Sequence, residues 1–108
     1  MEYEFVSECG YKCQLTRNRL GIFCGYVQLP EHHPYYDKDY FDIKNIDLKF
    51  ELSYGENGKF GFDCWNCLSP DETMRLIKSG KVYNGEWDYD KVKEETENMA
   101  KQFKKLET

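Results

Sequence analysis

The spacing of apolar residues changes along this chain, and that change constrains the fold more than any other feature of the sequence. In several stretches before residue 64, apolar and polar residues alternate with a period of two, which is typical of strands that bury one face. From residue 69 onward, apolar residues recur at intervals of three and four, which is typical of helices. Strands followed by helices indicate an α+β fold.

The first third of the chain predicts two strands joined by a turn. Tyr11, Cys13 and Leu15 alternate with polar neighbours, so they share one face of a strand. A turn is expected at 18–21, and a second strand at 22–29 ends where a proline follows. These strands supply the first half of an antiparallel sheet.

The clearest alternation of the chain runs from Ile46 to Tyr54. We expect this stretch to be a strand with one face buried, because a one-residue slip would turn its whole apolar set to solvent. A glycine-rich turn at 55–58 then leads into a partner strand at 59–64. Within that strand, Gly61 indicates a bulge or the close approach of a neighbouring group.

Two helix starts follow the strands. Ser69, Pro70 and Glu72 have the spacing of an N-cap, a first helical position and a capping-box glutamate, and this short helix should end near Gly80. A longer helix is expected to begin at Asp88. Its apolar stripe consists of Tyr89, Val92, Thr96, Met99, Phe103 and Leu106.

The predicted fold class is therefore α+β, with an antiparallel sheet of about four to five strands. The long C-terminal helix is expected to pack on one face of that sheet, with the short helix before it in the chain. With 108 residues and a mass of 12.9 kDa, the chain has room for one core, so residues 1–108 are predicted to form a single domain.

Charge and hydropathy exclude some partners. The 15 basic and 20 acidic residues give a formal net charge of −5, which disfavours binding to a nucleic acid polymer. No apolar run approaches the ~20 residues needed to cross a bilayer, and no export signal is recognisable at the N-terminus. We therefore expect a cytoplasmic protein without a membrane partner.

Aromatic residues are unusually frequent in this chain. Nine Tyr, seven Phe and two Trp make up 17% of the residues. Tyr and Trp can bury a ring while their polar atom reaches water or a ligand. The rings are thus compatible both with a small core and with a stacking pocket, and the sequence leaves the two open.

The cysteine content argues against a disulfide framework. The chain has five cysteines, an odd number, and no export signal, so reduced thiols are expected. The simplest interpretation is that Cys13, Cys24 and Cys64 are inert buried thiols. A zinc site formed by Cys9 and Cys13 with Cys64 and Cys67 stays open as an alternative. No cofactor motif is present, and no cofactor is expected.

A long loop at 30–42 is the main candidate for function. It holds two prolines and little periodicity, which predicts an ordered loop with one helical turn. If it folds over the end of the sheet, its rings and charges would form a pocket suited to a base, a ribose or an amide. The alternative is a tyrosine-rich lid on the core. The predicted ligand-facing residues are Tyr26, His33, Lys38, Asp39, Tyr40, Asp63 and Trp65.

The chain resembles a family of small uncharacterised proteins that are common in bacteriophage and prophage genomes. The resemblance covers residues 10–103 and rests on spaced words in the same order: Cys24-Gly25-Tyr26-Val27-x-Leu29-Pro30-x-x-His33-Pro34-x-x-x-Lys38-Asp39-Tyr40, then Gly61-Phe62-Asp63-Cys64, then Trp87-x-Tyr89-x-x-Val92. Where that family carries His-Gly-Gly in its middle strand, this chain has Lys49-Phe50-Glu51. A role tied to that histidine is therefore absent or moved here.

The resemblance implies a small accessory protein in the host cytoplasm that acts against host defence. We expect a non-enzymatic protein that binds a small ligand such as a signal nucleotide, because no nucleophile elbow, phosphate-binding glycine loop or HExxH motif is present. One alternative is an inhibitor that masks a host protein. Another is a metal-dependent hydrolase that uses His33 with Asp39 and Asp63. An edge strand or the stripe of the C-terminal helix could also form a homo-oligomer contact.

Overall fold

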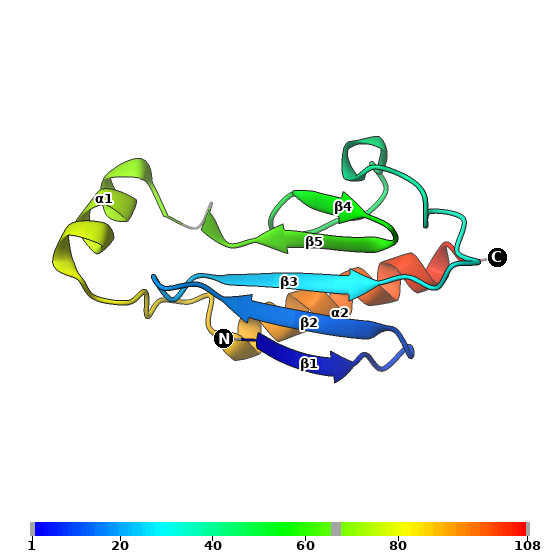
Figure 1. Cartoon of the computed structure of the whole chain (residues 1–108), viewed down its shortest axis with the longest axis horizontal. Helices are drawn as coiled ribbons and strands as arrows, with labels where there is room; N and C mark the ends of the chain where they lie inside the picture. The colour runs from blue at the N-terminus through cyan, green and yellow to red at the C-terminus, as the bar shows by residue number, and fades with distance from the viewer. Residues whose placement is uncertain (1, 66–67, 108) are drawn as a thin grey trace.

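The computed structural model describes residues 2–65 and 68–107 and confirms the predicted α+β class. A five-stranded antiparallel sheet with the strand order β1-β2-β3-β5-β4 is crossed on one face by the C-terminal helix α2, while the short helix α1 lies beyond one end of the sheet (Figure 1). The elements in chain order are β1 (Glu2–Val6), β2 (Lys12–Arg17), β3 (Phe23–Gln28), the 3₁₀ turn η1 (Tyr40–Asp42), β4 (Tyr54–Glu56), β5 (Lys59–Asp63), α1 (Pro70–Ser79) and α2 (Tyr89–Lys105).

Most of these elements begin or end at residues whose local sequence predicts a helix cap or a turn. The capping box of Ser69 with Glu72 forms as expected, and α1 ends at Gly80 in the left-handed conformation with φ = 69°. The side chain of Asp88 accepts the backbone N–H of Lys91 at the start of α2. The helical turn expected in the 30–42 loop is η1. β1 lies outside the predicted strands, although its residues also alternate between exposed and half-buried.

The predicted strand from Ile46 to Tyr54 is wrong, because strand pairing begins only at Tyr54. Its residues do alternate between exposed and covered positions, but the backbone at Asp47 and Lys49 bonds to side chains of α2, and a bond to a neighbouring strand is made at Ser53, whose N–H donates to the carbonyl of Gly61 in β5. The backbone N–H of Asp47 donates to Oε1 of Gln102 at 2.6 Å, and Nε2 of Gln102 donates to the carbonyl of Asp47 at 2.7 Å. The N–H of Lys49 donates to Oε2 of Glu95 at 2.8 Å. Alternation therefore reports burial of one face, while polar side chains on α2 replace a strand partner.

The covered face of the sheet forms the core with α2. The predicted stripe of α2 is buried from Val92 to Phe103 and also includes Ala100, while Tyr89 and Leu106 are half-buried. α2 packs directly against Gly25 of β3. A Cβ built on Gly25 would lie 2.2 Å from Oγ1 of Thr96 and 2.9 Å from the ring of Phe62. Only a residue without a side chain fits between β3 and the helix at this point.

The opposite face of the sheet carries no helix in the described part of the chain (Figure 1). Strand register aligns its side chains in cross-strand rows, because residues that pair across antiparallel strands point to the same side. We call this surface the open face. Its described side chains include Glu2, Glu4, Lys12, Gln14, Thr16, Cys24, Tyr26, Gln28, Lys59 and Asp63.

The first prediction concerns the side chains that replace a strand partner. Gln102→Met keeps the length of the side chain but removes both bonds to Asp47, so we expect the free energy of unfolding to fall by about 1–2 kcal/mol. Urea denaturation of this variant and of Lys105→Met, an exposed position on the same helix, measures the difference. Equal losses in the two variants would contradict the assigned bonds.

The second prediction concerns the contact between α2 and Gly25 of β3. Gly25→Ala should lower the free energy of unfolding by about 1–3 kcal/mol, because the new methyl group overlaps Thr96 and Phe62. The loss should be smaller when Gly25→Ala is made in a Thr96→Ala background, where the nearest overlapping atom is gone. A double-mutant cycle by chemical denaturation tests this, and strict additivity would refute the proposed contact.

Candidate functional site

The seven predicted ligand-facing residues do not lie in one place. Tyr26 and Asp63 stand on the open face, and His33 is buried beside α2. Trp65 follows β5 and packs against the core. The other three predicted residues, Lys38, Asp39 and Tyr40, are exposed on the long loop.

The long loop does not cover the open face. A Cβ built on Gly55 would lie 2.8 Å from the ring of Phe60, on the covered side of β4, and 2.9 Å from the backbone nitrogen of Tyr40. The loop therefore reaches β4 from the side of the core, whereas Tyr26 faces the other way. Within the loop, Nζ of Lys38 lies 5.4 Å from the ring centroid of Tyr35.

His33 joins the long loop to the end of α2. Its side chain is 3% exposed, and Nε2 donates to the carbonyl of Phe103 at 2.8 Å. Nδ1 accepts the backbone N–H of Tyr35 at 2.9 Å, so the partners assign a neutral ring with its proton on Nε2. Both nitrogens are thus engaged by the chain itself. The geometry gives no support to the hydrolase alternative, in which His33 would act with Asp39 and Asp63.

Metal binding through the predicted cysteines is equally unsupported. Cys67 lies outside the described residues, and Cys13 and Cys64 are buried as predicted. Burial raises the pKa of the Cys13 thiol to about 12, which keeps it protonated near neutral pH. The prediction of a buried thiol is wrong for Cys24, which is half-buried on the open face. Across 2–65 and 68–107, no cluster of His, Cys, Asp or Glu side chains is arranged to hold a metal ion.

His32, the neighbour of His33, also reaches the end of α2. Its Nε2 donates to Oε1 of Glu107 at 2.8 Å, while Oε2 of Glu107 accepts bonds from the hydroxyl of Tyr11 and, at 3.3 Å, from Nζ of Lys104. We call these residues, His32, Tyr11, Lys104 and Glu107, the C-terminal clasp. The bonds from His32 and Tyr11 lower the pKa of Glu107 to about 2. The double histidine of the sequence therefore holds the loop on the helix.

The third prediction follows from the charge of the C-terminal clasp. A carboxyl group whose pKa falls from 4.5 to about 2 on folding stabilises the native state fully above pH 4.5, and loses that contribution as the pH drops toward 2. Glu107→Gln should lower the melting temperature near neutral pH and remove this acid-dependent component. Between pH 4.5 and 2, the melting temperature should then fall less steeply for the variant than for the wild type.

Thermal unfolding followed by circular dichroism tests this prediction. Glu94→Gln is the matched control, because Glu94 is an exposed carboxylate on the same helix. If the melting temperatures of the wild type and of Glu107→Gln fall equally between pH 4.5 and 2, the C-terminal clasp carries no charge-dependent stability.

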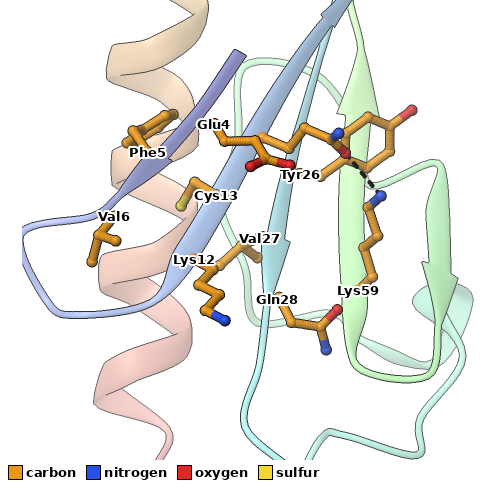
Figure 2. Close-up of a pocket in the computed structure, with 10 residues that line it drawn as sticks. Glu4, Phe5, Val6, Lys12, Cys13, Tyr26, Val27, Gln28 and Lys59 are labelled. Carbon is orange, nitrogen blue, oxygen red and sulfur yellow. Dashed lines mark hydrogen bonds between the residues drawn. The ribbon is translucent and has the colours of Figure 1, made fainter. Parts of the chain in front are cut away.

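A cavity with a volume of about 580 Å³ lies on the open face. Side chains and backbone from β1, β2, β3 and β5 line it (Figure 2). Its lining residues are Glu4, Phe5, Val6, Lys12, Cys13, Gln14, Tyr26, Val27, Gln28 and Lys59. Tyr26 is the only member of the predicted set that lines this cavity.

Tyr26 occupies the middle of the open face because its partner has no side chain. It pairs with Gly61 across β3 and β5, and a Cβ built on Gly61 would lie 2.4 Å from Cδ1 of Tyr26. The ring therefore lies over Gly61, which explains the glycine within a predicted strand as close packing from a neighbour. The ring of Tyr54 meets Tyr26 edge-on, with centroids 5.6 Å apart.

Lys59 presents a fixed positive charge beside this ring. Its Nζ donates to Oε1 of Gln14 at 2.9 Å and lies 4.7 Å from the centroid of Tyr26 (Figure 2). An ammonium group has three donors, and these contacts restrain its position while using one of them. The half-buried lysine can therefore donate to a further acceptor without first losing side-chain freedom.

The remaining polar groups complete a mixed lining. Lys12 and Lys59 flank Gln28 in one cross-strand row, and Glu4 lies in the adjacent row with Gln14. Nε2 of Gln28 is held by the carbonyls of Leu29 and Asn57 at 3.0 and 3.2 Å. The lining offers two cations, one carboxylate and two amides, but no arrangement of a nucleophile with a base. These groups can donate hydrogen bonds to a polar ligand and accept hydrogen bonds from it.

Sequence reasoning missed every lining residue except Tyr26. Part of the signal was present in the alternation of β2 and β3, where each buried residue is followed by a more exposed one. What was lacking is the register, because only the pairing of strands shows that Lys12, Gln28 and Lys59 form one row.

Comparisons with protein-family models, with curated proteins and with solved structures found no match to this chain. None of the helices in 2–65 and 68–107 is long and apolar enough to span a bilayer.

Proposed function

We propose that this chain is a non-enzymatic binding protein and that its open face receives a small anionic ligand. The observation that carries the proposal is the ammonium group of Lys59, held between Gln14 and the ring of Tyr26 with donors to spare. A cation fixed in advance binds an anion with a smaller loss of entropy than a mobile surface lysine does.

The size of the cavity supports a small molecule as ligand. Its volume of about 580 Å³ lies within the range of roughly 300–1,000 Å³ that is usual for small-molecule sites. Pairing through β3 places Lys12 two strands from Lys59, or about 10 Å between backbones. Lys12 thus supplies a second positive charge at the other side of Gln28 and adds to the attraction for an anion held at Lys59.

The mixture of charges supports a ligand that is more than a simple anion. The carboxylate of Glu4 points over the middle of the face in Figure 2, where it can accept from a hydroxyl or amino group. The amide of Gln14 lies between Glu4 and Tyr26 in the same row. A nucleoside monophosphate combines a phosphate, hydroxyl groups and a ring, and it is the class we propose.

The resemblance to phage accessory proteins agrees with a role in binding a signal nucleotide within the host cytoplasm. It supports the proposal because two of its sequence motifs contain Tyr26 and Gly61, which pack against each other on the open face. Binding without turnover would suffice for sequestration.

The fourth prediction tests Lys59 directly. AMP, GMP, CMP and UMP are titrated into the protein by calorimetry, with adenosine as the uncharged reference. At least one nucleotide should bind, adenosine should bind more weakly, and Lys59→Met should weaken nucleotide binding by about ten- to a hundredfold. The physical reason is the loss of a charge-assisted hydrogen bond of roughly 1.5–3 kcal/mol.

Lys44→Met is the matched control, because Lys44 is an exposed lysine outside the cavity. Equal binding by wild type and Lys59→Met, equal losses in Lys59→Met and Lys44→Met, or the absence of binding by all four nucleotides would overturn the proposal.

A further inference from the structure

Helix α1 is the element with the least support from the rest of the chain. None of its residues is buried, and Met74 and Ile77 are each 51% exposed. Figure 1 shows the helix beyond the end of the sheet, apart from α2. Its 10 residues are fewer than the ~12–15 that an isolated helix needs to be even marginally stable in water. The helix therefore leaves an apolar surface that lacks a partner within the described residues.

The apolar residues of α1 form one continuous side. Met74 and Ile77 are three positions apart and share one strip, which we call the α1 strip. Thr73 and Leu76 lie next to it and are half-buried, and Leu76 lines a groove of about 430 Å³ together with Val82. The segment after α1 thus covers one flank of the apolar side and leaves the α1 strip open.

The segment that follows α1 is anchored to the turn between β2 and β3. The backbone N–H of Tyr83 donates to the carbonyl of Leu20 at 2.5 Å, in the turn between β2 and β3. Gly21 in that turn has φ = 82°, and a Cβ there would lie 2.8 Å from the carbonyl of Tyr83. The anchor holds the end of the segment that returns from α1, so the α1 strip is presented outward from a fixed point.

The charges beside the α1 strip are arranged for self-pairing. The first turn of α1 is acidic at Asp71 and Glu72, and its last turn is basic at Lys78. At about 100° per residue, Asp71 and Lys78 lie on the same flank of the strip. An antiparallel pair of α1 helices would bring Asp71 of each copy toward Lys78 of the other, whereas a parallel pair would oppose like charges.

We infer that the α1 strip is a self-association surface, on which Met74 and Ile77 pack antiparallel against the same residues of a second copy of this chain. This arrangement has two-fold symmetry, so each copy gives and receives the same contacts. It also opposes the two helix macrodipoles favourably. The inference is independent of the ligand proposed for the open face.

The two homo-oligomer surfaces expected from sequence are less suitable. The stripe of α2 is buried within its own core, so its proposed role as an oligomer contact is wrong. Antiparallel pairing of the β1 edge centred on Glu4 would set Glu4 against its own copy, and such like-charge contacts are a common protection of edge strands.

The expected dimer is weak. A contact between two short helices buries less than the roughly 1,000 Å² typical of stable interfaces. The dimer should therefore form reversibly as the protein concentration rises from micromolar to millimolar.

The fifth prediction concerns the mass of the wild type and its variants in sedimentation equilibrium. Ile77→Glu should raise the dimer dissociation constant by at least about tenfold, because it places a carboxylate in the apolar contact. Asp71→Lys should also weaken the dimer, and the exchange Asp71→Lys with Lys78→Asp should restore part of the loss. Arg75→Glu is the control, because Arg75 lies on the polar side of α1.

Circular dichroism confirms that each variant is folded before its mass is compared. A wild type that stays monomeric at millimolar concentration would overturn the inference. So would a dimer that Ile77→Glu leaves intact, or one that Arg75→Glu weakens as strongly as Ile77→Glu.

Discussion

A crossed pair of glycines and aromatic rings between β3 and β5 determines what each face of the sheet can do. Gly25 pairs with Phe62, and the next residue Tyr26 pairs with Gly61. On the covered face, Phe62 fills part of the space that Gly25 leaves, and α2 takes the rest through Thr96. On the open face, the ring of Tyr26 lies over Gly61. The pair of Gly25 and Phe62 thus completes the packing of the core, and the neighbouring pair of Tyr26 and Gly61 lies at the base of the cavity on the open face.

The two histidines of the long loop have a structural role, because both bond to the C-terminal end of the chain. His33 gives both ring nitrogens to the chain, and His32 reaches the carboxylate of Glu107. These adjacent residues therefore fasten one loop to the C-terminal end of the chain, through the backbone carbonyl of Phe103 in α2 and the side chain of Glu107 just after it. A ligand that needed these groups would have to break the contacts that hold the helix end, whereas the open face is accessible without such a change.

Local signals were sufficient for some elements and not for others. Both helix starts were predictable, because a cap needs only residues within one turn, as Ser69 and Asp88 show. The stretch before Tyr54 failed because alternation records burial of one side and says nothing about the backbone partner, which Gln102 supplies here. The cavity was missed for a related reason, since rows across the sheet depend on a register that no single strand contains.

The aromatic excess finds three uses in the structure. Some rings build the core, as Phe60 does against Phe103 with centroids 5.2 Å apart. Others complete a contact that would otherwise be hollow, as Tyr26 does above Gly61. Rings also contact charged groups, and the ring of Tyr26 restrains the ammonium group of Lys59 in this way. The composition was compatible with a core and with a stacking surface, and the structure places rings on both faces of the sheet, with Phe60 on the covered face and Tyr26 on the open face.

The most direct test of this account is to measure intermolecular nuclear Overhauser effects between a bound nucleoside monophosphate and the side chains of the protein. A nucleotide bound on the open face should give contacts from ligand protons to the ring of Tyr26 and to the methylene groups of Lys59. Contacts to the rings of Tyr35 and Tyr40 in the long loop, with none to Tyr26, would contradict it.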